Sequence, residues 1–338
     1  MKEENEDLRK QLENNHNGNT PENAIEYTET RISQSHKMLS DELYNYINRK
    51  LEERDRRLEE YKNFKKAEDW MLTFGFDNML SQLQLYEIEQ RFPGNRSKIE
   101  SFQNSHVGEK CFVIGNGPSL NAEDLTTLKD NHIFCLASKG IYNIFDDTPW
   151  RPDIWGVSDL DYIKLKEKDI NKLSGFPKFV CAQAILRHNI EIKDAIYYPF
   201  IQAERQPCFF NKDITRGIHF YGTITGKLIN IAVYMGFTEI YLLGCDHTLP
   251  MKIDENGKKV VDTSVNSHFN NKYFSNEQER SQVYKNVIDA EKSFQYTTQA
   301  YADIKYHCEK QLGVQIYNAS RKSALEVFPR INFDEVIR

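Results

Sequence analysis

The stretch that decides the fold is CFVIGNGPSL, residues 111–120. Its first four residues are apolar without alternation, which is typical of a strand buried on both faces. The two glycines of the following Gly-Asn-Gly let the backbone turn sharply, and a polar residue at 119 or 121 is suited to cap a helix that begins near Ala122. A buried strand, a glycine turn and a helix form the β–α unit of α/β domains.

The same alternation continues toward the C-terminus. Short apolar, β-branched runs are separated by amphipathic stretches of helical spacing. The expected strands are 111–115, 132–138, 153–159, 178–183, 196–200, 239–246 and 314–320, and the expected helices are 122–129, 160–173, 223–235 and 281–312. Apolar strands that alternate with helices indicate a mostly parallel sheet. We therefore predict a Rossmann-like α/β domain over residues 110–338, with helices covering both faces of its sheet.

Residues 1–70 differ from this domain because charged residues are much denser there. From Glu22 to about Lys66 there is no glycine or proline, and apolar residues recur near helical spacing. We expect a long helical arm over 1–70 and a helical connector over 71–109. A thin apolar stripe needs a partner, so a coiled coil that makes a homo-oligomer is one reading. A helix packed on its own domain, or a partly disordered leader, is the other.

Composition excludes several classes of protein. The 338 residues carry 44 Lys+Arg and 50 Asp+Glu, a net charge of −6, which argues against a nucleic-acid binder with a basic surface. No apolar run approaches the ~20 residues of a membrane span, and the N-terminus lacks the apolar segment of a signal peptide. The six cysteines are widely spaced, so neither disulfides nor a zinc site is indicated. We expect a cytoplasmic protein, with peripheral association at the inner face of the membrane left open.

The glycine turn after the first strand is the first candidate site. Ligands of open parallel sheets bind beyond the carboxyl ends of the strands. Gly115, Asn116, Gly117 and Ser119 lie there, where a close backbone and a helix N-terminus suit a nucleotide phosphate. The pattern is not G-x-G-x-x-G, because Leu120 occupies the place of the third glycine, so a dinucleotide is less favoured. An ordinary tight β–α turn is the alternative.

Polar residues also follow the later strands. Ser138, Asp159 and Asp246 each come at or after the end of an expected strand. A second small-residue turn, with Thr223, Thr225 and Gly226, opens an apolar helix and is suited to phosphate or sugar oxygens. Asp246 is a candidate for a ribose hydroxyl, a substrate or a metal, and its alternative role is that of a capping carboxylate.

Two histidines and one arginine are candidates for the chemistry. His247 follows the strand-end aspartate, and His268 lies beyond a stretch, Pro250–Ser267, that we expect to be a long loop without regular structure. Such loops often form lids over active sites, and a histidine there can serve as a general base. Arg321 is a candidate to offset charge on a departing phosphate. The alternatives are a surface-loop histidine and a solvated arginine.

Three motifs resemble a known group of enzymes. GNGPSL after the first strand, T-x-T-G before an apolar helix, and GFTEIYLLGCD are similar in kind and order to motifs of the bacterial sialyltransferases of the Campylobacter type. The similarity extends to the bacterial MptE-like proteins (domain of unknown function 115), which come from surface-polysaccharide clusters and are related to the 6-hydroxymethylpterin pyrophosphokinase. The ending YNASRKSALEVFPRINFDEV looks like that group. The resemblance covers about Lys110 to the C-terminus.

The resemblance implies an inverting, metal-independent glycosyltransferase that uses a CMP-activated sugar to build a cell-surface glycan. It places Asn116, Gly117, Ser119 and Ser138 near the donor on one side, and Thr223, Thr225, Gly226 and Asp246 on the other. Two departures stand out. The sialyltransferases have a tyrosine where this chain has Thr248, and their catalytic histidine corresponds to Lys272, so that only His268 of their two histidines remains.

Two other functions stay open. A pyrophosphokinase of the pterin type would transfer pyrophosphate from ATP and need Mg²⁺, with Asp159, Asp161 and Asp246 as its ligands. A non-enzymatic assembly protein would use the arm to recruit partners of glycan synthesis. In the leading hypothesis no cofactor is required, and the partners are a nucleotide-activated sugar and a hydroxyl acceptor.

Overall fold

The computed structural model describes residues 66–202, 208–248, 251–253, 255, 259–262, 268–269 and 290–337, together with positions 41, 44–46 and 48–50. The chain divides into two compact units, Met1–Trp70 and Met71–Arg338. Most of the expected arm lies outside the described residues, although its described positions between 41 and 50 are helical. No helix in the described part of the chain combines the length and apolarity needed to cross a bilayer.

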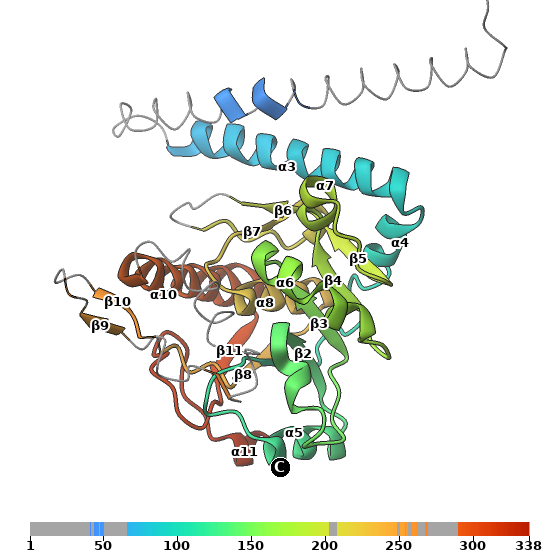
Figure 1. Ribbon diagram of the computed structural model, residues 1–338. Coiled ribbons are helices and arrows are strands. Elements are labelled where there is room, and N and C mark those ends of the chain that lie inside the picture. The colour runs from blue at the N-terminus through green and yellow to red at the C-terminus, as the bar shows by residue number, and fades with distance from the viewer. Residues whose placement is uncertain are drawn as a thin grey trace, which may run out of the picture. The chain divides into compact units, whose positions relative to one another are not determined.

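The second unit is built on a seven-stranded sheet (Figure 1). Its strands are β1 (Lys110–Ile114), β2 (Phe134–Ser138), β3 (Ile154–Val157), β4 (Lys178–Cys181), β5 (Ala195–Tyr198), β8 (Glu239–Leu243) and β11 (Gln315–Asn318). Their order is β11-β8-β1-β2-β3-β4-β5, and every pair of neighbours is parallel. Each strand overlaps an expected one, so the predicted parallel sheet is confirmed.

The direction of the connections reverses beside β1. From β1 to β5 each strand lies next to the one before, and the chain then returns to place β8 on the other side of β1. Right-handed crossovers put α5 (Ala122–Asp130) and α6 (Leu160–Lys172) on one face and α8 (Ile224–Met235) on the other, against β1, β2 and β3. The carboxyl ends of β1 and β8 therefore flank the topological switch point, where ligands of such sheets bind.

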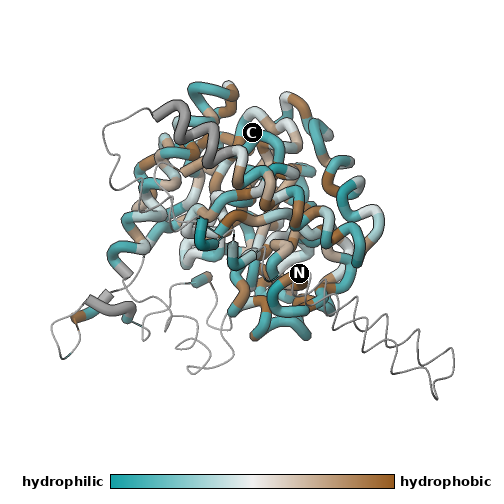
Figure 2. The backbone as a smooth tube through the Cα atoms, turned by 90° about the horizontal axis from the view of Figure 1, so that it is seen from above, coloured by the Kyte–Doolittle hydropathy of each residue, from teal (hydrophilic) through white to brown (hydrophobic). Residues whose placement is uncertain are grey.

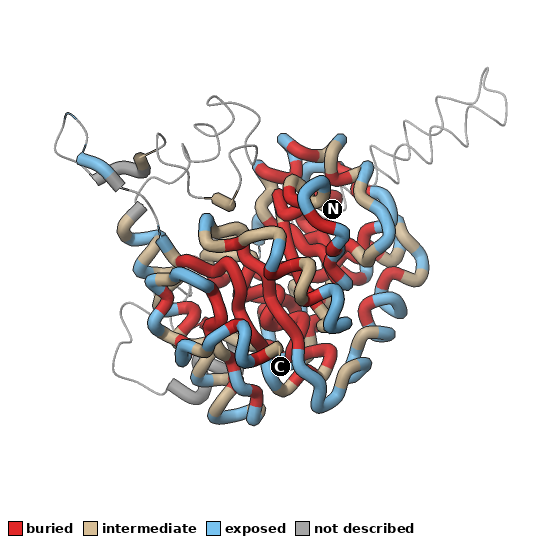
Figure 3. The backbone as a smooth tube through the Cα atoms, turned by 90° about the horizontal axis from the view of Figure 1, so that it is seen from below, coloured by how far each residue is buried: buried red, intermediate tan, exposed pale blue. Residues whose placement is uncertain are grey.

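The core follows from the apolar strands. The residues of β3, β4 and β5 are all buried, and β1 and β8 expose only their first residue. Figure 3 shows buried positions running through the middle of the fold, and the helices around it carry both apolar and polar positions in Figure 2. Helix α8 differs, because every residue from Thr225 to Met235 is buried. It is covered in part by α10 (Ala290–Tyr306), which contacts it.

Two N-terminal helices attach to the far edge of the sheet. They are α3 (Lys66–Arg91) and α4 (Asn95–Glu100). Asn95 of α4 accepts from the backbone N–H of Tyr197 at 2.8 Å and donates to its carbonyl at 2.9 Å. Gln84 of α3 makes the same pair of bonds to Phe200, in the short strand β6 (Phe200–Ile201). These amides satisfy backbone groups that an exposed edge would leave open.

The structure corrects several expected elements. The stretch expected to be a loop without regular structure contains an antiparallel pair, β9 (Met251–Ile253) and β10 (Lys259–Val261). The sequence carries Asn256-Gly257 between them, a hairpin signal that the expectation overlooked. The strand expected at 178–183 ends at Cys181, and α7 (Gln183–His188) follows. The strand expected at 196–200 is divided at Pro199 between β5 and β6.

The remaining elements are short. They are η1 (Lys139–Ile144), η2 (Ile214–Arg216), β7 (Ile218–His219, paired with β6), η4 (His307–Leu312) and α11 (Phe333–Ile337). The described part of the helix expected at 281–312 begins at Ala290, and its last six residues form the π-helical turn η4. A left-handed Gly313 ends that turn.

Candidate functional site

A cavity of about 730 Å³ opens at the carboxyl ends of β1, β2, β3 and β8. Residues of both glycine turns line it, as do side chains from α8 and α10. Ten of the residues expected to form the site are in its lining: Gly115, Asn116, Gly117, Ser138, Asp159, Thr223, Thr225, Asp246, His247 and His268. The lining also holds Lys139 and Lys227, which the sequence analysis did not single out.

The first glycine turn lies directly against the end of β8. Gly117 donates its backbone N–H to the carbonyl of Gly244 at 2.8 Å. A Cβ at position 117 would lie 2.6 Å from Cγ of Asp246, and one at Gly115 would collide with the Gly244 carbonyl oxygen. The two glycines are therefore needed for the contact between the turn and β8, in addition to leaving the cavity open.

Ser119 and Asp246 are occupied with each other. The Ser119 N–H donates to Oδ2 of Asp246 at 2.7 Å, and its hydroxyl donates to Oδ1. Burial raises the pKa of the Asp246 carboxyl above its ordinary value, and the bonds from Ser119 oppose that shift. Ser119 is not part of the cavity lining, so it braces the turn and does not reach a ligand from its present position.

Asn116 joins three parts of the site. Its side-chain Nδ2 donates to the carbonyl of Ser138 at 3.1 Å, and its backbone carbonyl accepts from the N–H of Phe269 at 3.0 Å. This second bond fixes the short described segment 268–269 to the glycine turn and brings His268 into the cavity lining. Oδ1 of Asn116 is buried and has no hydrogen-bond partner among the described residues. Such an acceptor calls for an N–H or O–H from a ligand.

His247 is held in the cavity lining by contacts to α10. Its Nε2 lies 2.7 Å from Oγ1 of Thr298, and its ring stacks on Phe294 with 4.2 Å between centroids. Burial lowers the pKa of His247 below its ordinary value, which favours the neutral ring. Both candidate bases, His247 and His268, line the same cavity.

Lys139 and Asp159 form an ion pair in the cavity wall. Nζ of Lys139 donates to Oδ2 of Asp159 at 2.7 Å. Burial alone would raise the pKa of Asp159, but the charge and hydrogen bond of Lys139, the N–H of Tyr162 and the charge of Lys227 together outweigh burial and lower the pKa to about 2. Asp159 also caps α6 by accepting from the N–H of Tyr162 at 3.1 Å. The expected ligand-binding aspartate is thus already engaged by a cation and a helix terminus.

Lys227 is the second cation that the sequence analysis missed. Its side chain is 2% exposed, and Nζ donates to the carbonyl of Thr223 at 3.3 Å. The rings of Phe200 and Phe220 lie 5.2 and 5.3 Å from Nζ. Burial lowers the pKa of Lys227 to about 7, with a further contribution from Lys139. A lone lysine inside the apolar helical run ITGKLINIAVYM was the available sequence signal.

The second small-residue turn is divided between two roles. Thr223 caps α8, with its hydroxyl accepting from the N–H of Thr225 at 3.3 Å, and both threonines line the cavity. Gly226 does not line it. A Cβ there would lie 2.8 Å from Cβ of Tyr221 and 2.9 Å from Cδ1 of Ile304, so this glycine serves the packing of α8 and not a nucleotide contact.

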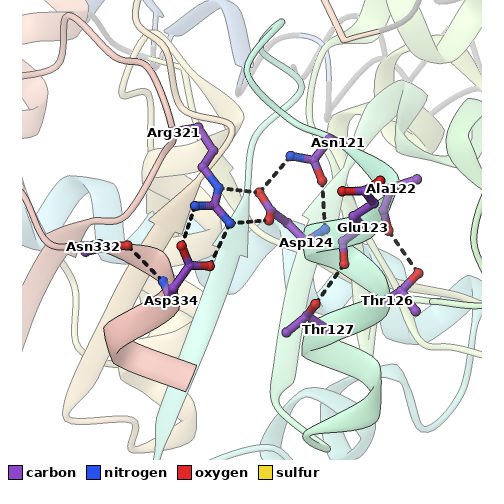
Figure 4. Close-up of polar contacts among 9 residues, drawn as sticks. All are labelled: Asn121, Ala122, Glu123, Asp124, Thr126, Thr127, Arg321, Asn332 and Asp334. Atoms are coloured by element: carbon purple, nitrogen blue, oxygen red, sulfur yellow. Dashed lines mark hydrogen bonds and ion pairs between the residues drawn. The ribbon is translucent and has the colours of Figure 1, made fainter. Parts of the chain in front are cut away.

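Arg321 lies away from the cavity. Its guanidinium donates two bonds to Asp124 and two to Asp334, at 2.7 to 3.1 Å, and so ties α5 to α11 (Figure 4). It is absent from the cavity lining. The expected role at a departing phosphate is therefore not supported by its position, because both edges of the guanidinium are already paired with carboxylates.

The residues expected to hold Mg²⁺ in the pyrophosphokinase hypothesis do not form a ligand set. Asp159 is paired with Lys139, and both carboxylate oxygens of Asp246 accept from Ser119. Within the described ranges, no group of three or more His, Cys, Asp or Glu side chains is arranged to hold a metal ion. Asp159 and Asp246 would have to give up these partners before they could bind the Mg²⁺ that the hypothesis needs.

Comparison with known proteins agrees with part of the resemblance seen in the sequence. No curated protein matches the chain. One similar solved structure is the MAf glycosyltransferase from Magnetospirillum magneticum AMB-1, with a TM-score of 0.42 and 15% identity over 69% of this chain. The chain corresponds to only 35% of that protein. Residues 85–251 match the model of the 6-hydroxymethylpterin diphosphokinase MptE-like family, and this part of the chain is therefore similar to that family.

Proposed function

We propose that the protein is a nucleotide-sugar-dependent glycosyltransferase that inverts the anomeric centre and takes a CMP-activated sugar. The observation that carries the proposal is the cavity itself, in which both glycine turns, two lysines and two histidines converge at the switch point of the sheet. Its volume of about 730 Å³ is within the range of small-molecule sites. The name of the MAf glycosyltransferase is consistent with this class but carries no weight at a TM-score of 0.42.

The transfer needs a base on the acceptor side of the anomeric carbon and an anion site on the side of the departing phosphate. An acceptor hydroxyl gives its proton to His268 or His247 while its oxygen forms a bond to the anomeric carbon. The bond from that carbon to the nucleotide phosphate breaks, and the phosphate leaves with the electron pair. Lys139, Lys227 and the N–H groups at the start of α8 line the cavity where negative charge can be stabilised. Oδ1 of Asn116 can accept a hydrogen bond from the nucleotide-activated sugar.

The pyrophosphokinase remains the second candidate, because the matched family is described as 6-hydroxymethylpterin diphosphokinase MptE-like. The two lysines in the cavity would suit ATP phosphates as well as they suit CMP. The carboxylates do not favour this candidate, since Asp159 and Asp246, two of the three that would bind Mg²⁺, are already paired.

A thermal-shift panel separates the two candidates. The protein is melted with CMP, CDP, UDP, GDP and ATP, each with and without Mg²⁺. A ligand at 100 times its dissociation constant stabilises the folded state by about 2.7 kcal/mol, which is easily measured. We expect stabilisation by CMP that does not depend on Mg²⁺. Stabilisation by ATP only in the presence of Mg²⁺ would contradict the glycosyltransferase and support the pyrophosphokinase.

A further inference from the structure

Lys227 presents an ammonium group to the cavity with few partners of its own. An ammonium has three N–H donors, and one of them goes to the Thr223 carbonyl. In the described part of the chain no carboxylate lies within ion-pair distance of Nζ, and the faces of Phe200 and Phe220 are its other neighbours. A buried cation is normally paired. Lys227 thus has donors left for a ligand.

A second cation, Lys139, lines the same cavity, and its charge affects Lys227. Lys139 and Lys227 both line the cavity, and the nearness of Lys139 makes a charge on Lys227 more costly. Asp159 offsets the charge of Lys139 through their ion pair but does not reach Lys227 as an ion-pair partner. The charge of Asp159 still acts on Lys227 and favours its charged form, whereas the Cys181 thiol stays protonated because burial raises its pKa to about 12.

The backbone at Lys139 is a further sign that this place is specialised. Lys139 has φ 46, in the left-handed region, where a lysine side chain is unfavourable. The indole N–H of Trp155 donates to its carbonyl at 3.0 Å and helps to hold that conformation. Strained residues of this kind occur where a structure must direct a side chain to a site. Here the conformation directs the ammonium to the cavity and to Asp159.

We propose that Lys139 and Lys227 form an oxyanion subsite at the α8 side of the cavity, and that this subsite binds the phosphate of the nucleotide. The inference rests on and deepens the proposed function, because it assigns the departing phosphate to the α8 side of the cavity, at the second of the two turns expected to hold it, and not to the Gly115–Gly117 turn. An oxyanion between the two lysines removes their mutual repulsion and uses the N–H donors that Lys227 has left.

The test uses sulfate, which stays a dianion at the pH values concerned, so any pH dependence belongs to the protein. Sulfate affinity is measured by thermal shift at pH 6.5 and 8.5 for the full chain and for Lys227→Met, Lys227→Arg and Lys178→Met. Lys178 is the matched control: it is 1% exposed, its Nζ also donates to a backbone carbonyl, burial lowers its pKa, and it lies outside the cavity lining.

We expect the wild-type protein to bind sulfate on the order of tenfold more tightly at pH 6.5, because Lys227 must be protonated to hold the anion. Lys227→Met should lose most of the binding, and Lys178→Met should keep it. Lys227→Arg should bind with little pH dependence, because arginine stays charged. His188, His247 and His268 also line the cavity. Burial lowers the pKa of His188 and of His247 below the ordinary histidine value, and any contribution of these three rings to the pH dependence persists in Lys227→Met.

The outcomes separate this inference from the proposed function. Sulfate binding by Lys227→Met within threefold of wild type, with the same pH dependence, would overturn the subsite. If sulfate binding depends on Lys227 but CMP and cytidine do not compete with it, the subsite stands and the CMP-sugar proposal fails. Competition by CMP and not by cytidine assigns the subsite to the nucleotide phosphate. Competition by free N-acetylneuraminic acid alone would overturn that assignment in favour of a sugar carboxylate.

Discussion

At the scale of single residues, two side chains of the site are held by unusual backbone geometry. Lys139 and His247 have φ 46 and 51, and each follows the end of a strand that reaches the cavity. A left-handed conformation costs on the order of 1–3 kcal/mol for a residue other than glycine. Both side chains are also fixed at their tips, Lys139 by Asp159 and His247 by Thr298. Both side chains therefore take positions in the cavity lining that local propensity alone would not give them.

Replacing His268 with alanine tests its role as the base. We expect kcat to fall by about 10²–10⁴ while CMP binding stays unchanged, because the base acts on the acceptor and not on the nucleotide. The measurement is steady-state turnover together with the CMP thermal shift. The control is His132→Asn, since His132 is exposed, lies outside the cavity and has a φ of 53 that asparagine tolerates. If His268→Ala keeps near-normal turnover and His247→Ala loses it, His247 and not His268 is the general base.

Replacing Lys227 with methionine should raise stability. Between the folded pKa of about 7 and the ordinary lysine pKa of 10.5, the unfolded chain binds a proton that the folded chain lacks. Raising the pH through that window therefore stabilises the wild-type protein at this residue. We expect Lys227→Met to gain on the order of 3–5 kcal/mol near pH 7, and the gain to shrink toward pH 10.5. Urea unfolding at several pH values measures it, and a gain that is independent of pH would contradict the explanation.

At the scale of elements, the contact between the ends of β1 and β8 builds one part of the cavity wall. The Gly115–Gly117 turn, the Gly244 carbonyl and the Ser119–Asp246 pair hold the two strand ends together. The neighbouring segment 268–269 is attached to the same turn through Asn116. Movement of this turn would therefore displace Asn116 and His268 together.

Gly117→Ala tests this coupling. The added Cβ would lie 2.6 Å from Cγ of Asp246 and 2.7 Å from the Gly244 oxygen, so the turn must shift. We expect a loss of about 1–3 kcal/mol in unfolding free energy and weaker nucleotide binding. Gly75→Ala is the control, because nothing lies within 4 Å of its Cβ and alanine favours a helix by roughly 0.5–1 kcal/mol. Unchanged stability and binding of Gly117→Ala would show that the contact is not needed.

At the scale of the whole molecule, the described site belongs entirely to the unit Met71–Arg338. The predicted oligomerising arm belongs to the other unit and lies largely outside the described residues. The assembly function that the sequence left open depends on that arm, whereas transfer chemistry depends on the cavity. The two roles can therefore be tested separately.

Deleting residues 1–65 should separate them. We expect the shortened protein to keep its nucleotide thermal shift, because every residue that lines the cavity remains. We also expect its mass in solution, measured by light scattering after size-exclusion chromatography, to fall to that of a smaller oligomer or a monomer. An unchanged oligomer would refute the arm as the means of association. Loss of the nucleotide shift would mean that the arm contributes to the site.

Much of the fold was predictable because its signals are local. Unbroken apolar runs of four or five residues, divided by amphipathic stretches, indicate buried parallel strands, and all seven strands of the sheet were expected. Because the carboxyl ends of such strands share one edge, ten of the expected site residues line one cavity. The similarity of residues 85–251 to the MptE-like family was likewise recognisable from motifs in the sequence.

The sequence by itself determined the parallel sheet and the edge that carries the site, since strand period and glycine turns are properties of neighbouring residues. Only the tertiary structure decided which polar groups remain free for a ligand. Arg321 is paired with Asp124 and Asp334 from distant elements, and Ser119 turns to Asp246. Lys227 lines the cavity, with the rings of Phe200 and Phe220 as neighbours of its ammonium. Charge pairing and burial depend on contacts between remote parts of the chain, and local patterns do not encode them.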